Sequence, residues 1–326
     1  MVKSKSDLSK NSKLKRDPEQ MKAVAQRYKD ALNSFVEKLK QDRYIIAAMV
    51  CGSLSYDEVW EKSDIDLIII TSDENKPFQS KILVEHGIML DAYIYSRNEF
   101  KKRLQGSFEG SILHSFFSKS TLLFTKDETI KEYYDYINHV GERDKELQLM
   151  QYYTFSYYLL TKAEKNLYIK NDPNLSYYFI ARAVTELAKL EVVINGQIPL
   201  RDVINQALAI NPSFFNAVYT DIIHIKKDEQ VLDHLLTVLN QYMDDNLLLV
   251  YKPVLEYLAN ASEVRSESEL NQYFGKKGIL LPTFYLLAEK GIVLPTTAPV
   301  RLTSKSTVQV DEPAYYYDGS VNGGED

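Results

Sequence analysis

The chain has 326 residues, 45% hydrophobic and 26% charged, which predicts two or three ordinary globular domains. The net charge of −6 argues against general attraction to nucleic acids or anionic membranes, and we expect neither a membrane span nor a signal peptide. The single cysteine, Cys51, excludes an intramolecular disulfide and a thiolate metal cluster, and it indicates a reducing, cytoplasmic environment.

The first part of the chain predicts a small domain that combines helices with a mixed sheet. Residues 1–17 hold six Lys/Arg among serines and are expected to be a disordered basic tail. A helix is predicted from Pro18 to about Gln41, because apolar residues recur there at helical spacing. Four apolar segments then predict strands: Tyr44–Val50, Ile65–Ile70, Ile88–Ile94 and Thr121–Phe124. Residues 18–140 therefore form one predicted domain.

The middle of the chain, residues 141–260, predicts an all-helical domain. Helical periodicity runs through 146–170 and 173–195, and Gly196 is expected to end the second helix. Leu232–Leu258 is again amphipathic, although Pro253 is expected to kink or break it.

The last segment, residues 261–326, has the outline of a winged helix. Two helices, near Ser266–Phe274 and Pro282–Lys290, are followed by three short β segments: Ile292–Leu294, Val300–Leu302 and Thr307–Val310. From Ser262 to the C-terminus there are six Lys/Arg against nine Asp/Glu, which is a poor balance for contacts with DNA phosphates. We expect a packing or acceptor-selecting module here, and an α+β fold class for the whole chain.

One segment carries a pattern suited to phosphoryl transfer. Gly52-Ser53 follows a predicted strand, and Asp64-Ile65-Asp66 follows after ten more residues. Asp64 and Asp66 are two apart on a strand, so their side chains share a face, and Asp91 lies on a separate predicted strand. If the two strands are neighbours, three carboxylates converge on a site suited to Mg²⁺ or Mn²⁺, in which two metals about 4 Å apart serve the attacking and leaving oxygens. Backbone N–H groups and the hydroxyl at Gly52-Ser53 can hold a triphosphate.

This combination of Gly-Ser, Asp-x-Asp between apolar residues and a distal strand Asp resembles the signature of the DNA polymerase β nucleotidyltransferase superfamily. The resemblance implies that Asp64 and Asp66 hold both metals and that Asp91 completes the metal that activates the acceptor hydroxyl. It further implies that Ser53 contacts the nucleotide phosphates, and that Gly52 allows their close approach. Asp64, Asp66 and Asp91 would then be both the metal ligands and the catalytic residues.

The predicted helical region resembles the domain that follows the catalytic domain in bacterial small-molecule nucleotidyltransferases, among them the aminoglycoside-modifying enzymes. Arg182, Glu186 and Lys189 share one helix face within Ala181–Leu190. One reading is a solvated stripe of ion pairs. The other is that Arg182 or Lys189 reaches the triphosphate and belongs to the nucleotide-binding residues.

We therefore expect a cytoplasmic enzyme that transfers a nucleoside monophosphate from a triphosphate such as ATP to a small hydroxylated acceptor, with release of pyrophosphate. Two alternatives stay open. The acceptor could be RNA, which the basic N-terminal tail favours, or a protein. The chain could instead be a nucleotide-sensing regulator that binds DNA, which the acidic C-terminal segment disfavours. Nothing in the sequence fixes the acceptor, the base or whether the chain forms a homo-oligomer.

Overall fold

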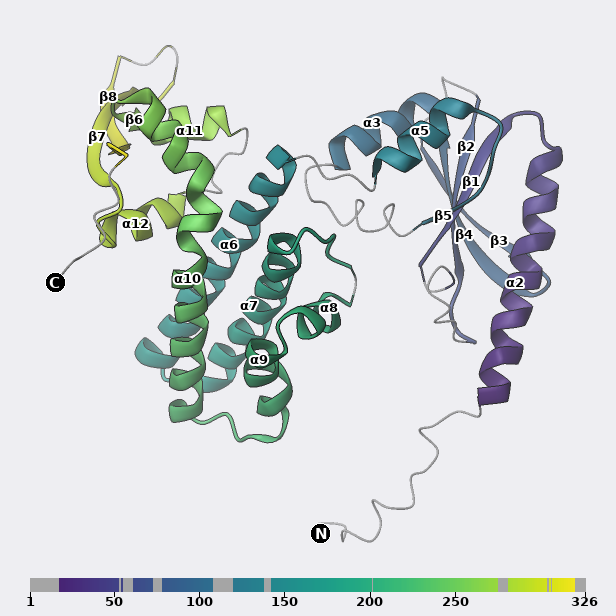
Figure 1. The fold of residues 1–326 in the computed structure, drawn as a ribbon, viewed down its shortest axis with the longest axis horizontal. Helices are drawn as coiled ribbons and strands as arrows, with labels where there is room; N and C mark the ends of the chain where they lie inside the picture. The colour runs from purple at the N-terminus through teal and green to yellow at the C-terminus, as the bar shows by residue number, and fades with distance from the viewer. Residues whose placement is uncertain are drawn as a thin grey trace, which may run out of the picture. The chain divides into compact units, whose positions relative to one another are not determined.

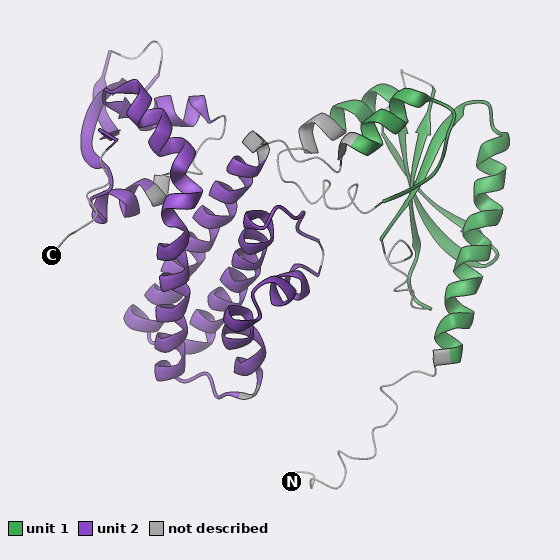
Figure 2. Ribbon diagram, viewed as in Figure 1, with its two compact units in different colours: residues 1–140 green, residues 141–326 purple. Residues whose placement is uncertain are grey.

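The computed structural model describes residues 18–52, 54, 61–72, 78–107, 120–137, 142–200, 202–274, 281–303, 305 and 307–319. The chain divides into two compact units, residues 1–140 and 141–326 (Figure 2). The predicted basic tail and Ser53 lie outside the described residues. The first unit combines a sheet with helices, and the second is mostly helical. None of the described helices is long and apolar enough to span a membrane.

The first unit is a five-stranded mixed sheet with helices on both faces. Its elements in chain order are α2 (Pro18–Gln41), β1 (Ile45–Cys51), β2 (Ile65–Thr71), β3 (Gln79–Glu85), β4 (Ile88–Ser96), α3 (Arg97–Ser107), β5 (Thr121–Thr125) and α5 (Glu128–Ile137). The strand order is β3-β4-β2-β1-β5. Only β2 and β4 are parallel to each other, and the other neighbours are antiparallel.

Helices cover both faces of the central strands, and this explains their continuous apolar sequences. Helix α2 packs on one face, while α3 and α5 lie on the other (Figure 1). The α2 face includes Leu32, Leu67 and Leu90, all buried. The opposite face includes Ile68 of the sheet together with Phe100 of α3. β1 and β2 are accordingly buried along almost their whole length.

The edge strand β3 is the one element of this sheet that periodicity does not predict. Its sequence, QSKILVE, is mostly exposed and only Glu85 is buried. A two-residue turn at His86-Gly87, both with positive φ, joins it to β4 in a tight hairpin. Strand β3 therefore lies at the edge of the sheet next to β4. It comes between β2 and β4 in sequence, but in the sheet β4 pairs directly with β2.

The second unit begins with a bundle of helices. It consists of α6 (Glu142–Glu164) with a π-helical turn at Lys165–Ile169, α7 (Pro173–Ile194), α8 (Val203–Ile210), α9 (Pro212–Phe215) with a π-helical and a 3₁₀ turn at Asn216–Thr220 and Asp221–His224, and α10 (Glu229–Ala261). Helix α7 ends as expected. Gly196, with φ +71°, donates to the carbonyl of Val193, and Gln197 donates to that of Val192, which is the Schellman pattern.

Helix α10 continues through Pro253, so of the two expected effects of this residue, a kink or a break, the break is wrong. A proline removes one backbone hydrogen bond and crowds the preceding turn, which costs a helix roughly 3 kcal/mol. Buried Val250, Val254 and Leu258 lie on both sides of Pro253 and pack into the core of this unit. This packing holds both halves of the helix in place.

The C-terminal part of the second unit is a small sheet with two helices. It contains β6 (Arg265–Ser266), α11 (Glu267–Tyr273), α12 (Leu281–Glu289), β7 (Leu294–Arg301) and β8 (Gln309–Tyr316), with the strands in the order β6-β8-β7 and all antiparallel. The two separate predicted strands at Ile292–Leu294 and Val300–Leu302 are wrong, because one continuous strand, β7, joins them. Pairing of every residue of β7 with β8 overrides its prolines.

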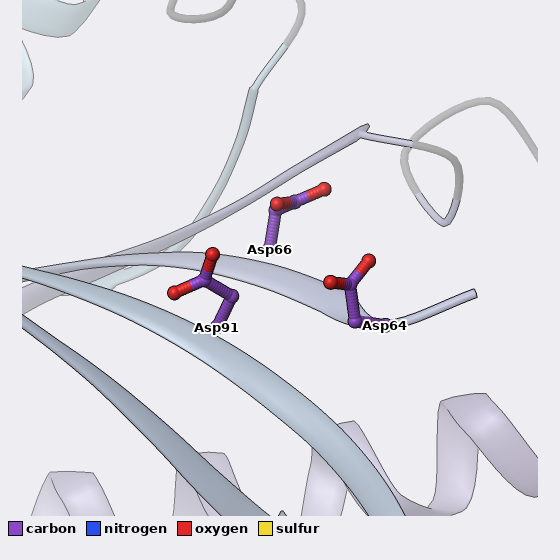
Figure 3. Close-up of side chains that lie close together, drawn as sticks. All are labelled: Asp64, Asp66 and Asp91. Atoms are coloured by element: carbon purple, nitrogen blue, oxygen red, sulfur yellow. The ribbon is translucent and has the colours of Figure 1, made fainter. Parts of the chain in front are cut away.

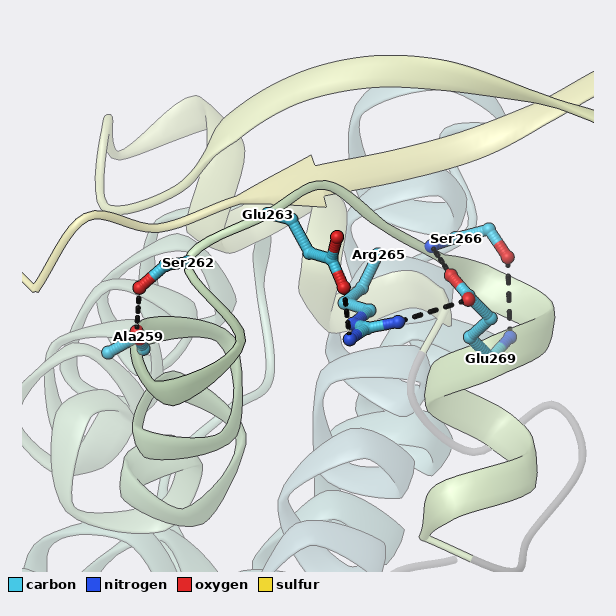
Figure 4. A network of polar contacts seen from close by, with 6 residues as sticks. All are labelled: Ala259, Ser262, Glu263, Arg265, Ser266 and Glu269. Atoms are coloured by element: carbon cyan, nitrogen blue, oxygen red, sulfur yellow. Dashed lines mark hydrogen bonds and ion pairs between the residues drawn. The ribbon is translucent and has the colours of Figure 1, made fainter.

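A polar network fixes the junction between α10 and α11 (Figure 4). Ser262 ends α10 in the left-handed conformation and donates to the carbonyl of Ala259. Arg265 then bridges Glu263 and Glu269. Ser266 and Glu269 form a reciprocal capping box that starts α11. The junction is thus specified by local side chains.

Candidate functional site

The parallel pairing of β2 with β4 brings the three predicted carboxylates together. Asp66 and Asp91 are direct partners in the register of the two strands, so their side chains stand on the same face. Asp64 lies two residues before Asp66, immediately before the first residue of β2. Figure 3 shows the three side chains converging. One ligand atom from each of Asp64, Asp66 and Asp91 lies within 4.8 Å of the others.

Gly52, at the end of β1, lies against this cluster. Cys51 is the register partner of Asp66, and the chain turns at Gly52 with φ +67°. A Cβ atom at position 52 would lie 2.1 Å from Oδ2 of Asp66. Only glycine therefore leaves the Asp66 carboxylate in its place, both because of this contact and because other residues rarely adopt a positive φ.

Two hydroxyl groups hold the Asp91 carboxylate. The Tyr93 hydroxyl donates to Oδ2 of Asp91 at 2.8 Å, and the Ser80 hydroxyl donates to Oδ1 at 3.3 Å. The hydrogen bond to Asp91, with burial as the second cause, raises the pKa of Tyr93 to about 12. Tyr93 therefore keeps its proton at neutral pH and stays a donor.

Sequence reasoning missed both of these residues. Tyr93 is two residues from Asp91 and so on the same strand face, which is a signal that could have identified it. Ser80 lies on β3, and no sequence pattern places it beside Asp91.

The carboxylates of the cluster contribute to the raised pKa values of two buried neighbours, Cys51 and Tyr28. Burial raises the pKa of the Cys51 thiol well above its usual value, and the Asp66 carboxylate adds to the shift. Burial likewise raises the pKa of Tyr28, with Asp64 and Glu61 contributing in the same direction. Three carboxylates in a partly exposed cluster offer only hard oxygen ligands, a donor set that fits Mg²⁺ or Mn²⁺.

The other predicted site residues lie elsewhere. Ser53 is outside the described residues, so the structure does not place its hydroxyl. Arg182 and Lys189 lie on α7 of the second unit. The Arg182 guanidinium is 5.8 Å from the ring centre of Phe155 and 5.7 Å from that of Tyr178. Lys189 forms an ion pair with Glu186 at 2.8 Å, as one reading of the sequence expected.

Comparisons with known proteins agree with this description of the fold. Residues 33–129, which include all three carboxylates, match the model of the polymerase beta nucleotidyltransferase family. A nucleotidyltransferase-like protein of Exiguobacterium sibiricum has a similar structure, with a TM-score of 0.59 and 15% sequence identity, over 88% of this chain and 98% of that protein. No curated protein matches the chain. Residues 33–129 are therefore a nucleotidyltransferase domain of the polymerase β type.

Proposed function

We propose that the chain is a metal-dependent nucleotidyltransferase that moves a nucleoside monophosphate from a nucleoside triphosphate such as ATP to a hydroxyl group of a small molecule. The observation that carries this proposal is the convergence of Asp64, Asp66 and Asp91 within 4.8 Å, inside the segment that matches the family. Such a cluster suits phosphoryl transfer, in which the protein positions the reactants and neutralises charge.

Asp64, Asp66 and Asp91 would hold the divalent metals, Mg²⁺ or Mn²⁺ in a two-metal site. When bound, the metals neutralise phosphate charge and make the acceptor hydroxyl easier to deprotonate. Asp64 and Asp66 are proposed to serve the metal that binds the nucleotide. Asp91 is proposed to favour loss of the proton from the acceptor hydroxyl.

The reaction forms a bond between the acceptor oxygen and the α-phosphorus, while the bond from that phosphorus to the leaving oxygen of pyrophosphate breaks. Gly52 and Ser53 are proposed to bind the phosphates next to Asp66. The support for Gly52 is its position beside the Asp66 carboxylate, where a Cβ atom would lie 2.1 Å from Oδ2 of Asp66. Arg182 and Lys189 stay proposed nucleotide-binding residues because of their positive charge along one face of α7.

The test is calorimetry of triphosphate binding with and without Mg²⁺. Asp64→Asn and Asp66→Asn remove one negative charge each with little change of shape. We expect metal-dependent affinity to fall below detection in both variants. Asp135→Asn, an equal change of charge at an exposed residue of α5 in the same unit, is the matched control and should bind as the wild type does. Unchanged metal-dependent affinity in the Asp64 and Asp66 variants would refute the proposed metal site.

A further inference from the structure

Three large apolar side chains stand exposed beside the carboxylates. Ile82, Val84 and Met89, here called the edge-strand patch, are 74%, 67% and 54% exposed. Ile82 is the register partner of Asp91, and Val84 is the partner of Met89, which is two residues from Asp91. All three therefore share the sheet face of the carboxylate cluster, since register partners and residues two apart point the same way.

The chemistry of this face changes in steps along β3 and β4. At one end Tyr95 is buried, and α3 covers it. The ring centres of Tyr95 and Phe100 of α3 are 6.4 Å apart, and the guanidinium of Arg103 of α3 lies 5.4 Å from the ring centre of Tyr95. The hydroxyls of Tyr93 and Ser80 come next, then Asp91 beside Ile82, and finally Met89 beside Val84. The edge-strand patch thus begins where the described cover from α3 ends.

The direction of attack places the acceptor on this side of the cluster. In the strand order β1-β2-β4-β3, Gly52 ends β1 on one side of Asp66, and the patch lies on the other side, beyond Asp91. Phosphoryl transfer sets the attacking and leaving oxygens roughly in line. If the triphosphate lies on the Gly52 side, the acceptor hydroxyl must approach across β4 and β3.

The charge on β3 and β4 favours a neutral or cationic acceptor over a polyanionic one. Across the fully described β3 and β4, the only Lys or Arg is Lys81, and its register partner is Ala92. Ala92 packs with Leu39 of α2, so Lys81 is on the opposite face. β3 and β4 therefore offer an approaching phosphate backbone no cation on this face, and this favours a neutral or cationic acceptor.

We propose that the edge-strand patch is the acceptor subsite, and that it takes a neutral or cationic small molecule with an apolar face next to the hydroxyl that is modified. This inference rests on the proposed function, because the role of Asp91 defines which side the acceptor occupies. Burying an exposed apolar surface of this kind stabilises a complex in proportion to the area covered.

The test follows the methyl groups of Ile82 and Met89 by NMR in the full chain, with Mg²⁺ and a non-hydrolysable triphosphate analogue present. The probes are hexyl β-glucoside, glucose and a short single-stranded RNA. We expect hexyl β-glucoside to shift both methyl signals with half-saturation at a concentration about tenfold or more below that of glucose. The RNA should leave both signals unchanged.

The double variant Ile82→Thr/Val84→Thr keeps β-branched side chains in the strand but makes the patch polar. It should raise the half-saturating concentration of hexyl β-glucoside about fivefold to tenfold, measured at Met89, and leave that of glucose unchanged. Ile169→Thr is the control, since Ile169 is 75% exposed in the second unit and should change nothing.

Two results of the titrations would overturn the subsite: equal half-saturating concentrations of hexyl β-glucoside and glucose, or shifts of the methyl signals caused by the RNA. A molecular mass of the double variant that differs from that of the wild type on sedimentation would also overturn it, because the patch would then be a self-association surface. Metal-dependent nucleotide binding is measured on the same samples. Its absence in the wild type would count against the proposed function, whereas nucleotide binding without preference for the hexyl glucoside would count against the acceptor subsite alone.

Discussion

Replacing Gly52 with alanine combines backbone strain with displacement of the Asp66 carboxylate, and comparison with Gly87→Ala separates the two effects. Alanine in the left-handed region costs about 1–2 kcal/mol. At position 52 its Cβ would also lie 2.1 Å from Oδ2 of Asp66, so the carboxylate must move by roughly 1.3 Å or more to reach an ordinary contact. Distances from metals to their ligands tolerate changes of only about 0.2 Å. We therefore expect Gly52→Ala to lose tenfold or more of its metal-dependent triphosphate affinity, which corresponds to about 1.4 kcal/mol.

Gly87→Ala is the matched control. Gly87 has φ +76° in the same unit, and a Cβ atom there would meet nothing within 4 Å. Denaturant unfolding should show a similar loss of stability in both variants, while calorimetry with Mg²⁺ and ATP should show a loss of affinity only for Gly52→Ala. Equal affinity in the two variants would refute the reasoning that glycine is needed to seat the Asp66 carboxylate.

Two further predictions follow from side chains of the same unit. Asp91→Asn should weaken metal-dependent nucleotide binding only severalfold but lower the rate of pyrophosphate release about a hundredfold, because the negative charge of Asp91 matters mainly in the transition state. Turnover equal to that of the wild type would exclude the proposed role of Asp91 in deprotonating the acceptor hydroxyl. Lys38 and Ser34 donate hydrogen bonds to Glu85, and the bond from Lys38 is the main cause of its lowered pKa. Because the pKa of Glu85 is lower in the folded than in the unfolded chain, its interactions stabilise the fold at pH values above the unfolded-state pKa, and this stability is lost as the pH falls through the folded-state pKa. Lys38→Met should therefore lower the stability measured in urea near neutral pH and lower it much less in acid. A pH-independent difference from the wild type would contradict this assignment.

The sequence predicts the central strands because helices bury them on both faces. A strand such as Ile65–Thr71 then reads as an apolar run in which a polar side chain like that of Asp66 stands out. The three carboxylates and the fold class could be predicted in this way, and the structure confirms the α+β fold.

The rest of the site depends on pairing between distant segments. Strand β3 has mostly exposed residues and lacks the alternation that marks a half-buried strand. Without β3 in the prediction, nothing in the sequence places Ser80 or Ile82 beside Asp91. The parallel pairing of β2 with β4, which skips β3 in sequence, is likewise set by tertiary packing, which local propensity does not encode.

Cys51 gives the chain a built-in reporter of local opening. It is the only cysteine, 1% exposed, and it lies across the strand pair from Asp66. Burial raises its pKa, so the closed state offers a thiol reagent neither access nor thiolate. The rate of covalent labelling thus measures how often the first unit opens, with no signal from the second. A ligand that holds the carboxylates together slows this labelling, and the free energy of binding can be read without following any chemistry at the phosphates.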